Sequence, residues 1–196
     1  MNICDHEFHS VTSAIPKVVT VSGSWNSPSK TRVLTDAVVA CLQARQSIDV
    51  TCIDLAEIGS EIAQLTDISK AGRNVCSLFS AVANADLLIV GSPIYKAAYT
   101  GQFKHFFDLI DPRALVDTPV LLTATGGSAH YALVLEHQFR PLFSFFRAHT
   151  LPTTVYAVEA DFENSALINQ GVKDRIENVA REAIIAITRR QQSLTG

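Results

Sequence analysis

Hydroxyl side chains gather after the first apolar run of the chain. Residues 18–21 are β-branched and apolar, and the stretch that follows contains Ser24, Ser29 and Thr31 but a single glycine. These three hydroxyls could donate hydrogen bonds to phosphate oxygens, with the charge of Lys30 beside them. A strand that enters a helix through such a loop also presents free backbone N–H groups. The stretch therefore predicts a phosphate site; an ordinary loop with a serine cap on its helix is the alternative.

The spacing within this loop excludes two common nucleotide motifs. A nucleoside-triphosphatase loop needs G-x-x-x-x-G-K-[ST], and Ser24 and Ser29 stand where its two glycines belong. The dinucleotide fingerprint G-x-G-x-x-G is also absent, because Gly23 is the only glycine in the loop. A terminal monophosphate suits the arrangement that remains.

A second candidate loop follows the third apolar run of the chain. Pro93 stiffens this loop, and Tyr95 and Tyr99 offer ring faces on which a planar ligand could lie. Ile94 and Lys96 belong to the same stretch. The alternative is that the aromatic rings pack on their own helix.

A third candidate loop, Thr125-Gly126-Gly127-Ser128, follows the apolar run at 120–124. Paired glycines let the backbone approach a ligand, where exposed N–H groups could bond ring carbonyl oxygens. The carboxyl ends of parallel strands share one edge of a sheet, so the three loops should meet. A phosphate, a planar ring and the polar edge of that ring together predict flavin mononucleotide (FMN) rather than an adenine nucleotide.

Apolar strands alternate with amphipathic helices along the chain. Strands are expected near 18–21, 48–55, 87–91, 120–124 and 153–158, and helices near 30–42, 75–83, 101–110, 133–146 and 172–187. Residues 56–72 are expected to form a long connection with at most a turn of helix. The alternation predicts an α/β, flavodoxin-like fold: a five-stranded parallel sheet (order 2-1-3-4-5) with helices on both faces. We expect a single domain at 17–190, a disordered or extended tail at 1–16 and a frayed end at 191–196.

Composition limits the partners and the cellular location that we expect for the protein. The chain has 196 residues, 47% of them hydrophobic, and a net charge of −3, which gives no reason to expect nucleic acid or a membrane as a partner. No run is long and apolar enough to cross a bilayer, and the N-terminus lacks a basic region followed by an apolar core. Cys4, Cys41, Cys52 and Cys76 show neither a C-x-x-C pair nor metal-ligand spacing. We therefore expect reduced core thiols, no metal site and a cytoplasmic location.

Three motifs occur in a fixed order along the chain. They are Ser-Gly-Ser-x-x-x-x-Ser-x-Thr at 22–31, Ser-Pro-Ile-Tyr-Lys-Ala-Ala-Tyr at 92–99 and Ala-Thr-Gly-Gly at 124–127. Together they resemble the NAD(P)H-dependent FMN reductase family of flavodoxin-like proteins, over residues 17–181. Within that family, residues 133–146 are most similar to the reductases that supply reduced flavin to two-component methanesulfonate and alkanesulfonate monooxygenases.

The resemblance implies hydride transfer from NADH or NADPH to N5 of FMN, with no catalytic residue because the flavin supplies the chemistry. It implies that Ser24, Ser29 and Thr31 bind the phosphate of FMN. It implies that Pro93, Ile94 and Tyr95 flank the isoalloxazine ring and that Thr125, Gly126 and Gly127 bond the edge of that ring. The predicted cofactor-binding set also includes Lys30, Lys96 and Ser128. One departure stands out. Trp25 and Asn26 replace the Pro-Arg pair that is common in the family, so Lys30 or Arg32 is expected to take over the contact of that arginine.

Residues 133–146 form a helix that is apolar on nearly every side, which predicts that its outer face meets another subunit. Pro141 lies inside this helix and cannot donate to the carbonyl of His137, so the helix must kink or carry a π-bulge there. In the reductases that it resembles, a π-helix at this place lies in a tetramer interface. The likeness implies a homotetramer or homodimer with Tyr99, His137, Phe139 and Pro141 at the bulge or interface. A surface histidine on a kinked helix is the alternative.

The sequence thus predicts an NAD(P)H:FMN oxidoreductase, with NADH favoured. We expect it to supply reduced FMN to a partner flavin-dependent monooxygenase, and we expect that enzyme to remove sulfite from sulfonates. Two alternatives stay open. One is an enzyme that retains FMN and reduces quinones, azo compounds or metal ions. The other is a non-enzymatic FMN electron carrier, although such carriers are usually strongly acidic. No motif for the adenosine end of the nicotinamide cofactor is legible.

Overall fold

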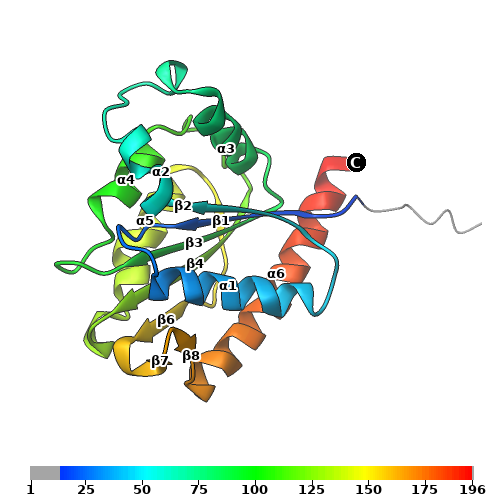
Figure 1. Cartoon of the computed structure of the whole chain (residues 1–196). Helices are drawn as coiled ribbons and strands as arrows, with labels where there is room; N and C mark the ends of the chain where they lie inside the picture. The colour runs from blue at the N-terminus through cyan, green and yellow to red at the C-terminus, as the bar shows by residue number, and fades with distance from the viewer. Residues whose placement is uncertain (1–13, 196) are drawn as a thin grey trace, which may run out of the picture.

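The computed structural model describes residues 14–195 and shows an α/β fold built on one parallel sheet (Figure 1). Its strands follow the order β2-β1-β3-β4-β5, and β6 also pairs with β4. The strands are β1 Lys17–Ser22, β2 Asp49–Asp54, β3 Leu87–Pro93, β4 Pro119–Gly126, β5 His149–Thr150 and β6 Val155–Val158. The predicted flavodoxin-like order is confirmed.

Helices cover both faces of the sheet. They are α1 Lys30–Gln43, α2 Leu55–Ile62, α3 Arg73–Ala83, α4 Gly101–Asp108, α5 Arg140–Phe145 and α6 Gln170–Thr195. Figure 1 shows α1 and α6 on one side and α2, α3 and α4 on the other. Because side chains alternate along a strand, Val18 and Leu87 pack in the core under α1 and α6, whereas Val19 and Leu88 pack in the opposite core.

The prediction of five strands needs a correction, since the fifth position holds two short strands. β5 pairs with Pro119 and Val120 near the start of β4, and β6 pairs with the residues from Thr123 to its end. Pro152 lies between β5 and β6 and has no N–H to give to a ladder, so the strand is interrupted there. The sheet therefore contains six strands arranged in five positions.

Three further elements differ from the prediction. α2 fills the first half of the connection expected at 56–72, and a 3-10 turn, η1 Ile68–Lys70, follows it. A small antiparallel pair, β7 Phe162–Glu163 and β8 Ala166–Leu167, precedes α6. α6 continues to Thr195, well past the expected start of a frayed end.

α2 begins without a loop, immediately after β2. The Asp54 carboxylate accepts a hydrogen bond from the Ala56 N–H at 3.0 Å and so caps the helix. Leu55, Ile58 and Ile62 are buried at helical spacing. That spacing was the sequence signal for this helix.

The expectation of core thiols is wrong for two of the three cysteines in the described chain. Cys52 and Cys76 are exposed, Cys41 is half-buried, and all three are free. Cys52 lies in β2, an edge strand of which only the last two residues are buried. Cys4 lies outside the described residues.

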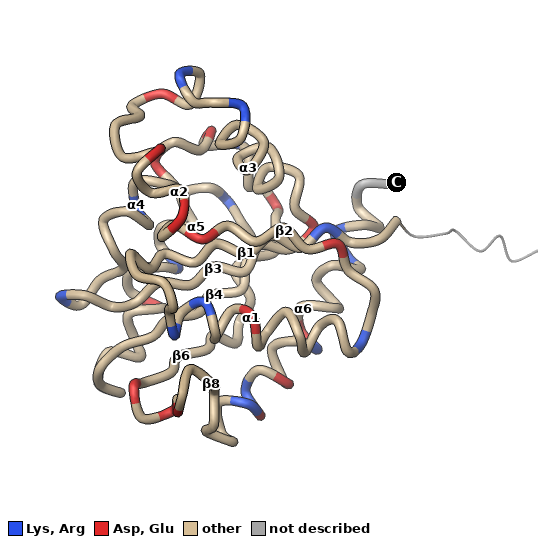
Figure 2. The backbone as a smooth tube through the Cα atoms, in the orientation of Figure 1, with Lys and Arg blue, Asp and Glu red and all other residues tan. Residues whose placement is uncertain are grey.

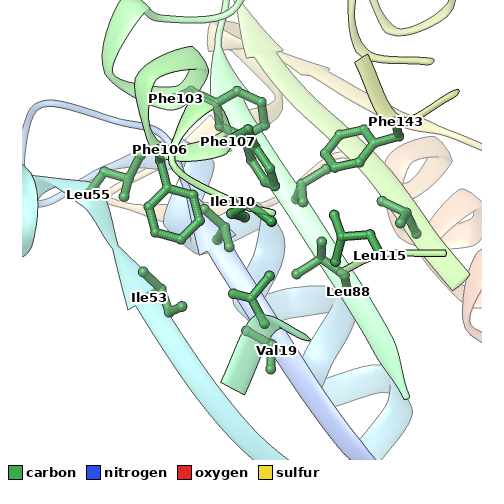
Figure 3. Close-up of a cluster of buried hydrophobic side chains, with 14 of the residues drawn as sticks. Val19, Ile53, Leu55, Leu88, Phe103, Phe106, Phe107, Ile110, Leu115 and Phe143 are labelled. Atoms are coloured by element: carbon green, nitrogen blue, oxygen red, sulfur yellow. The ribbon is translucent and has the colours of Figure 1, made fainter. Parts of the chain in front are cut away.

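The core beneath α2–α5 is rich in phenylalanine. Phe103, Phe106, Phe107 and Phe143 gather over the sheet in Figure 3, with ring centroids 4.8 Å apart for Phe103 and Phe107 and 5.0 Å for Phe107 and Phe143. All four side chains are fully buried. Offset and edge-to-face contacts of this kind stabilise a core beyond the area that they bury.

A π-helix, η3 Leu135–Phe139, leads into α5 and contains His137, where the sequence predicts a kink or a π-bulge. The Arg140 N–H donates to the carbonyl of Leu135, five residues back. Phe139 is buried within its own chain, against Tyr99 and Phe103. His137 is exposed.

No helix between residues 14 and 195 has both the length and the apolar character needed to span a membrane. In the same part of the chain, no group of three or more His, Cys, Asp and Glu could hold a metal ion. Basic and acidic residues are interspersed along the chain in Figure 2, as the small net charge suggests.

Candidate active site

The carboxyl ends of β1, β3 and β4 open into one pocket of about 290 Å³. Every predicted cofactor-binding residue except Lys96 and Ser128 lines this pocket. Five lining residues were not predicted: Asn26, Pro28, Val158, Glu159 and Phe162. The three loops are far apart in sequence and meet because parallel strands end at the same edge.

The first turn of α1 lines the pocket at Lys30 and Thr31. Ser29 is the N-cap, and its hydroxyl accepts a hydrogen bond from the Arg32 N–H at 3.4 Å. The N–H groups of Lys30 and Thr31 precede the first intrahelical bond and have no acceptor in the described part of the chain. They lie at the positive end of the helix dipole, an arrangement that favours an anion.

The hydroxyls of the first loop also hold the pocket together. Thr31 Oγ1 and Thr125 Oγ1 are 2.7 Å apart and buried, so they join α1 to β4. Ser24 Oγ accepts from the Asn26 N–H at 3.2 Å and donates to the Asn26 carbonyl at 3.1 Å. The cap proposed as an alternative for a serine is therefore present at Ser29, within a loop that also lines the pocket.

Charge in the pocket comes from one ion pair. Lys30 Nζ contacts Glu159, which lines the pocket from the end of β6. Arg32 bonds Asp36 at 2.8 Å and lies 3.7 Å from the Asp54 carboxylate, so it does not line the pocket. Of the two cations expected to replace the missing arginine, the structure thus places only Lys30 at the pocket. Nothing local in the sequence could have predicted its pairing with a residue so far along the chain.

The loop after β3 presents Tyr95 to the pocket, whereas Tyr99 is half-buried against Phe103 and Phe139. Tyr95 and Ala98 exchange both backbone hydrogen bonds, at 3.0 and 3.2 Å, around Lys96 and Ala97. Lys96 and Ala97 have φ of 52° and 63°, the left-handed values that a two-residue hairpin turn requires. Tyr95 is 46% exposed. Lys96 occupies the turn and does not line the pocket.

The second and third loops are tied together by their backbones. The Ile94 N–H donates to the Thr125 carbonyl at 2.7 Å. A Cβ added at Gly126 would lie 2.1 Å from the Tyr156 hydroxyl, which donates to the Ser128 carbonyl at 2.8 Å. A Cβ at Gly127 would meet nothing within 4 Å, so the backbone there is open to a ligand. Ser128 instead caps the short turn that follows.

Comparison with known proteins identifies this combination of fold and loops. Residues 16–163 match the model of the family described as NADPH-dependent FMN reductase. The chain belongs to that family. It is 48% identical over 167 residues to an FMN reductase (NADPH) of Pseudomonas aeruginosa, covering 85% of this chain and 90% of the relative. It is 47% identical to the NADH-dependent FMN reductase SfnF of Pseudomonas fluorescens, covering 85% and 89% of the two chains.

Two solved structures have the same fold. An oxidoreductase from Corynebacterium diphtheriae superposes with a TM-score of 0.78 at 32% identity, covering 89% of this chain and 98% of the other. The apo form of an NADH:FMN oxidoreductase, EmoB, superposes with a TM-score of 0.73 at 27% identity, covering 91% and 89%. The protein is therefore an NAD(P)H-dependent FMN reductase, with FMN and a nicotinamide dinucleotide as its cofactors.

The residues of the pocket fit an FMN molecule. The unpaired N–H groups of Lys30 and Thr31 suit a terminal phosphate. The exposed ring of Tyr95 and the open backbone at Gly127 suit a planar ring with polar edges.

Proposed function

We propose that the pocket at the ends of β1, β3 and β4 binds FMN for reduction by a nicotinamide, and that reduced FMN then leaves for a partner monooxygenase. The observation that carries the proposal is the convergence of three loops on a pocket with free helix N–H groups at one end and Gly127 at the other. In this assignment Lys30 and Thr31 hold the phosphate and Gly127 meets the ring edge. Pro93, Ile94 and Tyr95 flank the ring.

When bound, the flavin accepts a hydride at N5, so the protein need not supply an acid or a base. Among described residues, the ionisable side chains that line the pocket are Lys30, Tyr95 and Glu159, and two of these form an ion pair with each other. The contribution of the chain is therefore to bind and orient the two reactants.

Internal bonding of the pocket residues supports exchange of the flavin. Ser24 already donates its hydroxyl to the Asn26 carbonyl, and Lys30 is paired with Glu159. A phosphate must compete for these groups, which favours moderate rather than very tight binding. A reductase that gives its product to another enzyme needs such an affinity.

The test is anaerobic reduction of excess free FMN by NADH or NADPH, followed by loss of the visible flavin absorption. We expect bleaching over many turnovers. If only one equivalent per protein bleaches, the protein retains its flavin and is a reductase of other acceptors or an electron carrier. Substituting Lys30→Ala should weaken FMN binding. Lys104→Ala is the matched control, because it removes a partly exposed lysine of α4 that is likewise paired with a carboxylate, Asp108.

The resemblance at residues 133–146 supports a cytoplasmic partner that removes sulfite from an alkanesulfonate. A coupled assay with a sulfonate monooxygenase should release sulfite only when this protein, FMN and NADH are all present. If sulfite is released equally fast with chemically reduced FMN and without this protein, then the only role of this protein in the assay is to supply reduced FMN. No sulfite release under either condition would rule out that monooxygenase as the partner.

We also propose that the segment around the π-helix lies between subunits of a homotetramer or homodimer. Tyr131, Leu133 and Phe145 are 47%, 63% and 67% exposed, so large apolar side chains are left uncovered before η3 and at the end of α5. Light scattering of the purified protein tests this. A monomeric mass, or an oligomer unchanged by Phe145→Ser together with Leu133→Ser, would contradict it.

A further inference from the structure

A groove of about 510 Å³ runs between α2 and α4 beside the flavin pocket. Gly59, Ser60 and Ala63 of α2 line one wall, and Gln102 and His105 of α4 line the other. The two helices are in direct contact, and Figure 1 shows them side by side. A Cβ at Gly59 would lie 1.5 Å from the Gln102 amide, so this glycine lets the helices approach.

Trp25 separates the groove from the flavin pocket. Its ring lines the groove, while its neighbours Ser24 and Asn26 line the pocket. Trp25 also meets Tyr95 edge to face, with the ring centroids 6.1 Å apart. Tyr95 lines the pocket and Trp25 lines the groove, so each cavity borders one member of this aromatic pair.

This tryptophan is 57% exposed, although it is the largest apolar side chain of the chain. An exposed aromatic face beside an active site is a surface on which a planar group can stack.

We infer that the groove between α2 and α4 binds the adenosine half of the nicotinamide dinucleotide, with Trp25 as the stacking surface for the adenine. The inference rests on the proposed function, because it requires the nicotinamide half to reach the flavin pocket. The Ser60 hydroxyl is exposed and makes no hydrogen bond within residues 14–195, so it is available to the ribose. Gln102 is held in place by its bond to the Leu55 carbonyl at 2.6 Å.

The charge of the groove selects NADH over NADPH. Among the described residues, no Lys or Arg lines it, and α2 carries Glu57 and Glu61 but no basic residue (Figure 2). Nε2 of His105 lies 2.9 Å from the Ile62 carbonyl. A 2′-phosphate on the ribose would therefore meet no lysine or arginine in the groove, and the glutamates of α2 add negative charge to one of its walls.

Trp25 is the only tryptophan of the chain, so its fluorescence reports on the groove directly. We expect ADP-ribose, which lacks the nicotinamide, to quench this emission saturably in the FMN-free protein. The 2′-phosphorylated analogue should bind about tenfold more weakly or worse. Absence of saturable quenching, or equal affinity for the two ligands, would overturn the inference.

Kinetics with a truncated substrate provide the second test. Trp25→Ala should raise the KM for NADH about tenfold more than the KM for reduced nicotinamide mononucleotide, which has no adenosine. Trp25→Phe keeps an aromatic ring and should raise the KM for NADH much less. An equal rise for both substrates would place Trp25 at the nicotinamide or flavin instead and overturn the inference.

The wild-type protein separates this inference from the proposed function. If it reduces FMN with the mononucleotide as efficiently as with NADH, the groove has no role although the reductase function stands. If it reduces free FMN with neither substrate, the proposed function itself fails.

A gain of function should also follow. Ser60→Arg places a guanidinium in the groove, and we expect it to raise kcat/KM for NADPH relative to NADH by about tenfold. Arg substituted at Ser77, on the exposed surface of α3, is the matched control and should leave the ratio as it is.

Discussion

The two faces of the sheet are covered by different kinds of packing. One face lies under two long helices, α1 and α6, and its core is mostly Val, Leu, Ile and Ala. The other lies under the shorter α2, α3, α4 and α5 and the π-helix, and seven phenylalanines fill its core: Phe79, Phe103, Phe106, Phe107, Phe139, Phe143 and Phe146. Large flat rings can fill the irregular space left between short helices that meet the sheet at different places.

The two faces also carry different features of the molecule. The aliphatic face carries α1, whose first turn lines the pocket. The aromatic face carries the groove beside Trp25, the π-helix and the exposed side chains of Leu133 and Phe145. Features that distinguish this chain from a plain parallel sheet with helices lie on the face with short helices.

The largest expected effect tests the aromatic face directly. Phe107→Ala removes a ring whose centroid lies within about 5.3 Å of those of Phe103, Phe106 and Phe143. We expect the free energy of unfolding to fall by about 3–5 kcal/mol in urea denaturation. Ile187→Val on the aliphatic face is the conservative reference and should cost about 0.5–1.5 kcal/mol. Equal losses would break the comparison.

A second change tests the link between the aliphatic face and the pocket. Thr125→Val leaves the buried Thr31 hydroxyl without its partner and should cost about 1–3 kcal/mol. The double variant Thr31→Val, Thr125→Val should recover much of that loss, because neither hydroxyl then remains unpaired. Thermal or urea unfolding of the cycle measures the coupling; strictly additive losses would show that the two hydroxyls do not depend on each other.

Substitution of the two glycines at the end of β4 compares stability with ligand binding within a single loop. Gly126→Ala should displace Tyr156 and lose its bond to Ser128, at a cost in stability of about 1 kcal/mol. Gly127→Ala meets open space and should leave stability unchanged, while its methyl group weakens FMN binding about tenfold. Unfolding curves and flavin titrations of the two variants should therefore rank them in opposite orders.

The smallest effect concerns the π-helix and is dependent on pH. Arg140 bonds Glu136 at 2.9 Å, and these bonds hold the pKa of the Glu136 carboxyl below its ordinary value. A lowered pKa means that the pair stabilises the fold above the ordinary pKa and that this contribution disappears as the pH falls through the lowered value. The carboxylate is partly exposed, so we expect Glu136→Gln to cost only about 0.2–1 kcal/mol at neutral pH.

Unfolding of both proteins across the acid range measures this difference. The stability gap between wild type and Glu136→Gln should close on acidification. A gap that persists at low pH would mean that shape and packing, rather than charge, matter at this position.

Much of the fold could be predicted because strands that are covered on both faces have continuous apolar sequences. The flavin pocket could be predicted because loops at the carboxyl ends of such strands must converge. α2 was missed because it follows β2 with no loop between them and Asp54 serves as the end of one and the cap of the other. The pairing of Lys30 with Glu159 and the burial of Phe139 depend on distant contacts that no local pattern encodes.

Thr125 lies in the third loop of the pocket and bonds to residues of the other two segments. Its hydroxyl meets Thr31, its carbonyl accepts from Ile94, and its chain neighbour is Gly126. The walls are thus locked to one another before any ligand arrives, so little conformational entropy is left to lose on binding. In the proposed function, such a preorganised pocket lets FMN enter and leave without the backbone of the site folding around each new molecule.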